Sequence, residues 1–281
     1  TGNTEATVDY AVNSDSNSFN GNLGTVSSGE TTSFAINTDE TFPLQNVSLD
    51  VDGQHFSNSQ KQLKCTPTKG LVGYWPFNEE QTTDNWTKDI SGQQNNGSIE
   101  GQVNTGVTSP VGEAYEFNGG SIDVPDNVVN EEGSLNIVAW TSLDEFTGDH
   151  RFFWGSPISI QMGVDKDNKW ELEAETTSGN GVRLSGSSFN SDEWYHVSAF
   201  VKDNESTGFH INGNLDANTS LSGDLNDKDH RIGAKKSSSA QWLGKIQGVR
   251  IYNRSLSQSE IQRLYSVRSE DWAIEACKLT N

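Results

Sequence analysis

The stretch Glu193-Trp194-Tyr195-His196-Val197-Ser198-Ala199-Phe200-Val201 places Val197, Ala199 and Val201 at every second position. This alternation is typical of a strand with one buried face. Other short apolar runs, each ended by Gly, Asn or Asp, occupy residues 70–77, 114–124, 135–140, 208–213 and 244–254. Their even spacing predicts an all-β fold, an antiparallel jelly-roll β-sandwich.

The composition excludes several classes of protein. Lys plus Arg number 19 against 39 Asp plus Glu, a formal net charge of −20. Nucleic acid is therefore not expected as a partner, because a nucleic-acid protein needs a basic face. No apolar run approaches the roughly 18 residues of a membrane span. We find no Gly-x-Ser-x-Gly elbow and no Gly-rich phosphate loop before a helix.

A separate block precedes the sandwich. The sequence predicts short strands at residues 6–12, 31–36 and 47–51, separated by Gly, Asn and Ser clusters. The Asp52-Gly53 step is a hairpin signal, since Gly supplies the positive φ of a tight turn. We therefore predict a small β-sandwich-like N-terminal domain over residues 1–64.

The two cysteines, Cys65 and Cys277, are interpreted as a disulfide, with two buried free thiols as the alternative. A bridge closing a loop of roughly 210 residues would stabilise the fold by about 4 to 5 kcal/mol in the chain-entropy model. It would also imply an oxidising compartment. The chain starts at Thr1 rather than Met, which we interpret as a mature or trimmed, exported chain.

One short helix is expected near the C-terminus. Ser257 is a candidate N-cap with Glu260 three residues on, and Leu256 and Ile261 are spaced as the hydrophobic staple of that capping box. Ile261 and Leu264 share one face, so the helix should pack against the sandwich.

Residues 70–268 resemble the laminin-G-like or concanavalin A-like jelly-roll domains. The motifs that carry the resemblance are Leu71-Val72-Gly73-Tyr74-Trp75-Pro76-Phe77-Asn78, Asp89-x-Ser91-Gly92-x-x-Asn95-Asn96-Gly97, Phe117-Asn118-Gly119-Gly120 with Ile122-Asp123-Val124, Trp194-Tyr195-His196-Val197, and Val249-Arg250-Ile251-Tyr252-Asn253-Arg254-Ser255-Leu256-Ser257. It implies a jelly-roll domain over 65–268 and leaves 269–281 as a tail that carries Cys277. The N-terminal block, through residues 43–53, resembles the β-domains of archaeal pilins and archaellins.

The resemblance also implies one Ca²⁺ near the start of the jelly roll. Calcium prefers six to eight oxygen ligands, which a Gly- and Asn-rich turn can supply. The candidate ligands are Asp89, Asn95, Asn96, Asn78 and Glu79. One departure weakens the set, because Gln247 stands where relatives carry an acidic residue. The alternative is that Asp89 makes only an Asx-turn.

The run Trp170-Glu171-Leu172-Glu173-Ala174-Glu175 is the most enzyme-like feature. On a strand its three glutamates share one face, with neighbours about 7 Å apart. The row loosely resembles the Glu-x-Asp-x-x-Glu signature of jelly-roll glucanases, but a glutamate replaces the central aspartate. The alternative is an ordinary strand with a solvated face, and we expect no enzyme.

Glycan recognition needs exposed aromatic rings beside hydrogen-bonding groups. Trp75, Trp140 and Trp194 sit in strand motifs and are assigned to the core, whereas Trp154 and Trp242 are the candidates for a binding face. The alternative for these two is that they cover the sandwich edges.

Together these features predict an extracellular, non-catalytic adhesion or glycan-binding protein of the cell surface, whose partner is a glycan or a cell-surface protein. The alternative is a subunit of a pilus-like surface filament that assembles through its N-terminal segment. A polysaccharide hydrolase comes third. Six sequons are candidate glycosylation sites: Asn46, Asn85, Asn96, Asn204, Asn218 and Asn253.

Overall fold

The computed structural model divides into two compact units, residues 69–265 and a smaller unit formed by residues 1–68 with 266–281. The structure describes residues 5–13, 18–27, 46–51, 54–57, 63–83, 85–129, 133–146, 148, 150–156, 159–225, 230–234, 240–266 and 272–274. Up to residue 65 and within 272–274 the description covers the backbone alone. In this part of the chain no helix is long and apolar enough to cross a membrane.

The smaller unit contains an antiparallel sheet of four strands in the order β2-β1-β3-β4. The strands are β1 (Glu5–Asn13), β2 (Ser18–Ser27), β3 (Asn46–Val51) and β4 (Gln54–Ser57). Val51 of β3 pairs with Gln54 of β4, which confirms the hairpin predicted at Asp52-Gly53. The strand predicted at 31–36 lies outside the described residues.

The same unit also joins the segment before the jelly roll to the C-terminal tail. Strand β5 (Leu63–Cys65) pairs in parallel with β22 (Trp272–Ile274), and Cys65 lies opposite Ile274. Cys277 lies outside the described residues, so the disulfide stays a prediction.

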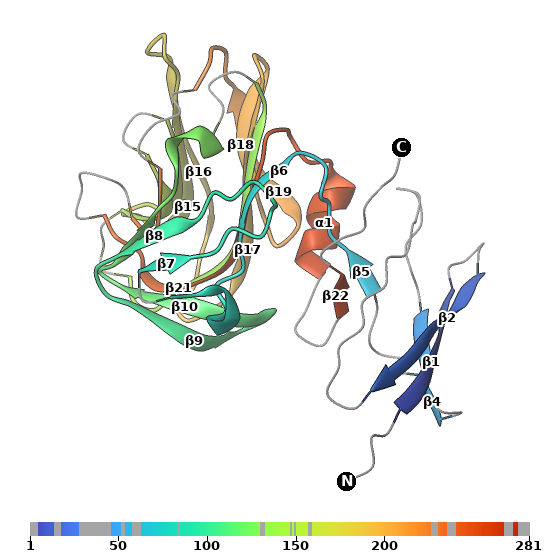
Figure 1. The fold of residues 1–281 in the computed structure, drawn as a ribbon. Helices are drawn as coiled ribbons and strands as arrows, with labels where there is room; N and C mark the ends of the chain where they lie inside the picture. Colours follow the sequence, from blue (N-terminus) through green and yellow to red (C-terminus); the bar gives the residue numbers. More distant parts are fainter. Residues whose placement is uncertain are drawn as a thin grey trace. The chain divides into compact units, whose positions relative to one another are not determined.

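The larger unit is a sandwich of two eight-stranded sheets, here named sheet I and sheet II (Figure 1). Sheet I has the order β19-β18-β17-β12-β21-β10-β9, and β6 also pairs with β21. Its strands are β6 (Leu71–Trp75), β9 (Val103–Ser109), β10 (Gly112–Asn118), β12 (Leu135–Leu143), β17 (Tyr195–Lys202), β18 (Ser206–Ile211), β19 (Asn214–Ser220) and β21 (Leu243–Tyr252).

Sheet II has the order β16-β15-β14-β13-β20-β11-β8-β7. Its strands are β7 (Trp86–Thr87), β8 (Gly97–Glu100), β11 (Ser121–Asp123), β13 (Arg151–Gly155), β14 (Ile160–Val164), β15 (Lys169–Glu175), β16 (Gly181–Ser188) and β20 (Arg231–Ile232). Two short 3₁₀ helices, η1 (Glu79–Gln81) and η2 (Asp126–Val128), lie in the connections. The strands of the two sheets pair with one another in antiparallel fashion, which confirms the predicted sandwich.

The core lies between the two sheets. Val197, Ala199 and Val201 of β17 are all buried in it, which confirms the alternation predicted for this strand. Trp75 and Trp170 are among the largest fully buried side chains. Because each strand sends alternate residues inward, the remaining residues of sheet II form a second, outward face.

Helix α1 (Gln258–Ser266) packs on the outward face of sheet I, where Ile261 and Leu264 contact Val138 and Tyr252 (Figure 1). The Ser257 backbone N–H donates to Glu260 Oε2 at 2.8 Å, and the Glu260 N–H donates to Ser257 Oγ at 3.3 Å. These reciprocal bonds confirm the predicted capping box.

Candidate functional site

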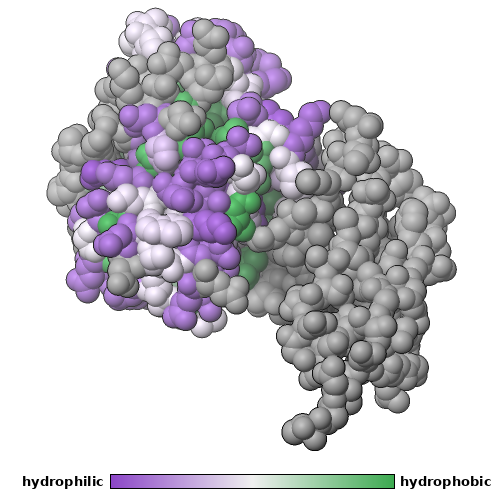
Figure 2. Space-filling model, in the orientation of Figure 1, coloured by the Kyte–Doolittle hydropathy of each residue, from purple (hydrophilic) through white to green (hydrophobic). Residues whose placement is uncertain are grey.

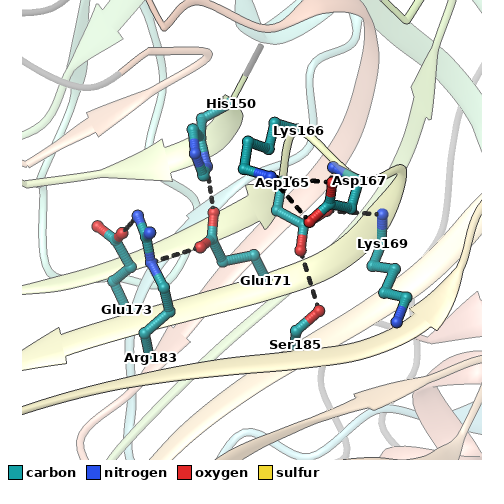
Figure 3. A network of polar contacts seen from close by, with 9 residues as sticks. All are labelled: His150, Asp165, Lys166, Asp167, Lys169, Glu171, Glu173, Arg183 and Ser185. Carbon is teal, nitrogen blue, oxygen red and sulfur yellow. Dashed lines mark hydrogen bonds and ion pairs between the residues drawn. The ribbon is translucent and has the colours of Figure 1, made fainter. Parts of the chain in front are cut away.

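The outward face of β15 carries a network of paired charges (Figure 3). Trp170, Leu172 and Ala174 enter the core, so Glu171 and Glu173 share the opposite face, as the sequence predicts. The expectation of a solvated face is wrong for Glu171, whose side chain is only 1% exposed. A carboxylate buried in this way needs charged or hydrogen-bonding partners.

The partners of Glu171 come from outside its own strand. His150 Nδ1 lies 2.6 Å from Glu171 Oε2, and Arg183 Nε of β16 lies 2.6 Å from Glu171 Oε1. The same guanidinium pairs with Glu173 through Nη2. Arg183 therefore bridges both carboxylates, while His150 holds the far oxygen of Glu171 (Figure 3).

This geometry fixes hydrogen-bonding groups on the outward face of sheet II. A glycosidase needs one carboxyl group as the acid and another as the nucleophile or base. Here one guanidinium binds both candidate carboxylates. The arrangement suits recognition of hydroxyl groups, for which fixed donors and acceptors are required.

Asp165, in the turn between β14 and β15, borders this network. Its Oδ1 accepts from the backbone N–H groups of Asp167 at 2.9 Å and Lys169 at 3.0 Å. Its Oδ2 accepts from Ser185 Oγ of β16 at 2.9 Å, as Figure 3 shows. Asp165 thus ties the turn to the neighbouring strand.

The Asp89 loop is built by hydrogen bonds within the protein. Asp89 Oδ1 accepts from the N–H groups of Tyr74 and Ser91, both at 2.8 Å. Asp89 Oδ2 accepts from Ser91 Oγ and from the Asn95 N–H, again both at 2.8 Å. A carboxylate offers about four acceptor positions, so all of them are used.

Two of the other proposed calcium ligands also use their amide oxygens within the protein. Asn96 Oδ1 accepts from the Asp89 N–H, and Asn78 Oδ1 caps η1 by accepting from the Gln81 N–H. Asn95 Nδ2 donates to the Val72 carbonyl at 2.8 Å. Among the described residues no three His, Cys, Asp or Glu side chains gather as a metal site.

The structure gives Asp89 the alternative role, an Asx-turn that anchors the start of β6. The bonds of Asn95 and Glu79 use N–H groups, because the Glu79 backbone N–H donates to Glu113 Oε2 at 2.8 Å. Calcium binding by Asp89, Asn95, Asn96, Asn78 and Glu79 stays a prediction.

The assignment of Trp154 and Trp242 to a binding face is wrong. Both side chains are fully buried, and Trp242 packs between Phe153 and Trp170 at ring distances of 5.8 and 6.5 Å. A β-bulge in β13 turns Trp154 into the core beside Phe153. Trp75 and Trp140 are buried, as predicted, and Trp194 is half-buried.

Among the described residues, Trp86 of β7 is an exposed large aromatic side chain, 39% accessible. Sequence reasoning left it unassigned because no alternating pattern surrounds this two-residue strand. The described surface in Figure 2 is mostly hydrophilic with scattered apolar residues. An exposed indole therefore stands out on this molecule.

Five of the six candidate glycosylation residues are exposed: Asn85, Asn96, Asn204, Asn218 and Asn253. The side chain of Asn46 lies outside the described part. Their exposure permits modification, and the use of these sequons stays a prediction.

The family model of the concanavalin A-like lectin/glucanases superfamily matches residues 117–262, just over half of the chain. The chain belongs to this superfamily. A search of curated proteins found no match.

Three similar solved structures illustrate the fold. The binding domain of Paraclostridial Mosquitocidal Protein 1 has 16% identity and a TM-score of 0.58, covering 70% of this chain and 52% of that one. A botulinum neurotoxin type C structure, whose cell entry is described as dependent on interaction with two ganglioside molecules, has 14% identity and a TM-score of 0.54, covering 70% and 50%. Trypanosoma rangeli sialidase with the inhibitor DANA has 17% identity and a TM-score of 0.56, covering 71% and 33%.

At these identities the likeness shows the fold alone. This chain spans about half the length of the two toxin structures and a third of the sialidase. The superfamily contains lectins and glucanases alike, so the fold does not choose between binding and hydrolysis. That choice depends on the residues of the outward face.

Proposed function

We propose that the chain is a non-catalytic glycan-binding module. The observation that carries the proposal is the network of Glu171, His150, Arg183 and Glu173, which fixes donors and acceptors on the outward face of sheet II. Groups held in place before a ligand arrives lose little entropy on binding. Membership of a superfamily of lectins and glucanases supports the same proposal.

Our proposal assigns no hydrolytic role to Glu171 and Glu173. Support comes from Arg183, which binds both carboxylates, and from the 1% exposure of Glu171. A carboxylate that is bound by a guanidinium and removed from solvent is poorly placed to act as a general acid, because a substrate cannot reach it.

We place this activity at a cell surface, as adhesion through a glycan. The interpretation of Cys65 and Cys277 as a disulfide and the five exposed sequons support an extracellular setting. The filament alternative rests on β2 and β4, the outer strands of the N-terminal sheet in the part of the chain that the structure describes, since an edge strand can pair with another chain.

A glycan array probed with the labelled full-length chain tests the proposal. We expect saturable binding to a subset of glycans that persists in EDTA, because the Asp89 loop uses its own oxygens. Incubation of the bound glycans with the chain should release no reducing sugar. Absence of any glycan hit would contradict the binding function, and reducing-sugar release would contradict the non-catalytic assignment.

A further inference from the structure

The strand registers of sheet II align one residue from each of its eight strands in a single row. Trp86 of β7 pairs with Ser98 of β8, and Ser98 pairs with Asp123 of β11. Asp123 pairs with Arg231 of β20, and Arg231 pairs with Gly155 of β13. The first half of the row thus runs from Trp86 to Gly155.

The row continues through the other half of the sheet. Trp154 pairs with Met162, which places Gly155 beside Gln161 of β14. Gln161 pairs with Glu173 of β15, and Glu173 pairs with Arg183 of β16. Neighbouring strands lie about 4.8 Å apart, so eight strands make a row about 34 Å long.

The row lies on the outward face throughout. Beside seven of its members in sequence stand residues that belong to the core or pack against it, namely Ile99, Ile122, Ile232, Trp154, Met162, Leu172 and Leu184. Beside Trp86 stands Thr87, which is fully buried. Since strand residues alternate between faces, the row members point away from the core. We name this set the cross-strand row: Trp86, Ser98, Asp123, Arg231, Gly155, Gln161, Glu173 and Arg183.

The chemistry of the cross-strand row is that of carbohydrate recognition. Trp86 offers an exposed ring at one end, and apolar sugar faces stack on aromatic rings. Asp123 with Arg231, and Glu173 with Arg183, form two ion pairs along it. Planar guanidinium and carboxylate groups can each bind two adjacent hydroxyl groups.

Gln161 supplies an independent sign of a ligand. It is 5% exposed, and its Oε1 has no hydrogen-bond partner in the described part of the chain. Leaving a buried acceptor unpaired is unfavourable, and the hydroxyl group of a ligand could pair with it. Its position near the middle of the row places this acceptor between the two ion pairs.

The charge of this face indicates a neutral ligand. The strands of sheet II carry four cationic side chains, those of Arg151, Lys169, Arg183 and Arg231. Against them stand five carboxylates, which belong to Glu100, Asp123, Glu171, Glu173 and Glu175. An anionic sugar would therefore meet no net positive charge on these strands, in a molecule of net charge −20.

We infer that the cross-strand row binds an extended, neutral glycan chain that lies across the strands of sheet II, with Trp86 as its stacking platform and Gln161 as its central hydrogen-bonding group. The inference rests on the proposed glycan-binding function and adds to it the place, direction and charge of the ligand. Neutral chains should bind more tightly as they lengthen, until they span the row.

Two variants of the full-length chain test the row, each with a matched control in sheet I. Trp86→Ala removes the exposed ring, and Leu215→Ala removes an exposed apolar side chain from β19. Gln161→Met removes the unpaired amide, and Gln247→Met does the same at a residue that is also 5% exposed with an unpaired Oε1. Binding is measured to neutral glucose, mannose and galactose oligosaccharides of rising length, with sialyllactose as the anionic probe.

We expect Trp86→Ala and Gln161→Met each to weaken binding of neutral oligosaccharides roughly tenfold, and the two controls to leave it unchanged. Gln161→Met should also keep or raise the unfolding midpoint, because it removes an unpaired buried acceptor. A merely structural role of Gln161 would instead lower that midpoint.

The alternative outcomes separate the two proposals. If the wild-type chain binds neutral glycans and all four variants bind equally well, the cross-strand row is overturned and the glycan-binding function stands. If the wild-type chain binds sialyllactose and none of the neutral oligosaccharides, the inference that the ligand is neutral is overturned. If the wild-type chain binds neither the array glycans nor these oligosaccharides, both proposals fall.

Discussion

At the scale of single residues, Glu171 shows how a buried charge is accommodated. Glu171 follows the core residue Trp170 in β15 and points to the outward face of the sheet. Neighbouring groups nevertheless exclude water from its side chain. Removing a carboxylate from water is costly unless cations and hydrogen bonds replace the solvent. Arg183 is 57% exposed and His150 is 31% exposed, so both partners remain partly hydrated while Glu171 is not.

This asymmetry predicts unequal effects of removing either partner. Arg183→Gln should destabilise the fold by about 3 kcal/mol, because it leaves the Glu171 carboxylate buried beside His150 alone. Glu171→Gln should cost about 1 kcal/mol, since the exposed guanidinium can return to water. Urea unfolding followed by tryptophan fluorescence measures both changes.

The control is Glu175→Gln, which removes an exposed carboxylate from the same strand. It should change the free energy of unfolding by less than about 0.5 kcal/mol. Equal losses for Arg183→Gln and Glu175→Gln would mean that the buried ion pair contributes nothing to stability.

The candidate site shows where prediction from the sequence stops. The shared face of Glu171 and Glu173 follows from strand periodicity alone, whereas their partners do not. Arg183 and His150 reach them through strand pairing and the chain path before β13, which no local pattern encodes. Gln161 was missed for a related reason, because its place in the row depends on the registers of neighbouring strands.

At the scale of elements, strand β13 explains the error over Trp154. Alternation would send Phe153 and Trp154 to opposite faces, but the bulge between Phe152 and Trp154 places both in the core. A bulge inserts an extra residue and reverses the pattern beyond it. By contrast, α1 was predictable because Ser257 and Glu260 form its start through local contacts.

The pairing of β13 with β14 depends on Gly163. A Cβ atom at this position would lie 1.8 Å from the Arg151 carbonyl oxygen, so the backbone of β13 would have to move. We expect Gly163→Ala to destabilise the sandwich by about 3 kcal/mol or more. Thermal unfolding of the purified variant measures the loss.

Gly181→Ala in β16 of the same sheet is the matched control, because its nearest neighbour would lie at 3.7 Å, an ordinary contact. This variant should be neutral or slightly stabilising, since alanine restricts the unfolded chain. If Gly181→Ala lost as much stability as Gly163→Ala, the loss would come from replacing any glycine of the sheet and not from the contact with the Arg151 carbonyl oxygen.

The start of α1 predicts a pH dependence. Burial by itself would raise the pKa of Glu260, but hydrogen bonds from Arg254 and Ser257 and the charge of Arg254 outweigh it and lower the pKa to about 2. The folded pKa lies below the ordinary value of 4.5, so this stabilisation is present above pH 4.5 and is lost as the pH falls towards 2.

Glu260→Gln should therefore cost about 1 to 3 kcal/mol at neutral pH and progressively less between pH 4.5 and 2. Chemical unfolding of wild type and variant across this range measures the gap. Glu205→Gln, which removes an exposed carboxylate paired with Lys202, is the control for the change of charge alone. A gap that stays constant down to the lowest pH would contradict the capping role.

At the scale of the whole molecule, the dominant feature is the acidic surplus. With 39 acidic against 19 basic residues, the folded chain has a net charge of −20. The ion pairs among the described residues involve only part of these carboxylates, so the remainder repel one another in the compact state. Self-repulsion of this kind is screened as the Debye length falls from about 10 Å at 0.1 M salt to about 3 Å at 1 M.

We therefore expect the midpoint of thermal unfolding to rise by several degrees, roughly 4 to 8 °C, between low salt and 1 M NaCl. KCl should raise the midpoint equally, because screening depends on ionic strength. A non-ionic osmolyte at matched osmolality is the second control, since it acts by preferential exclusion and does not screen charge. The ion pairs of Arg183 and Arg231 oppose this trend, since salt weakens exposed pairs too, but the excess of carboxylates makes repulsion the larger effect. A midpoint that falls with added NaCl would show that these attractive pairs, and not the surplus charge, control the stability of the fold.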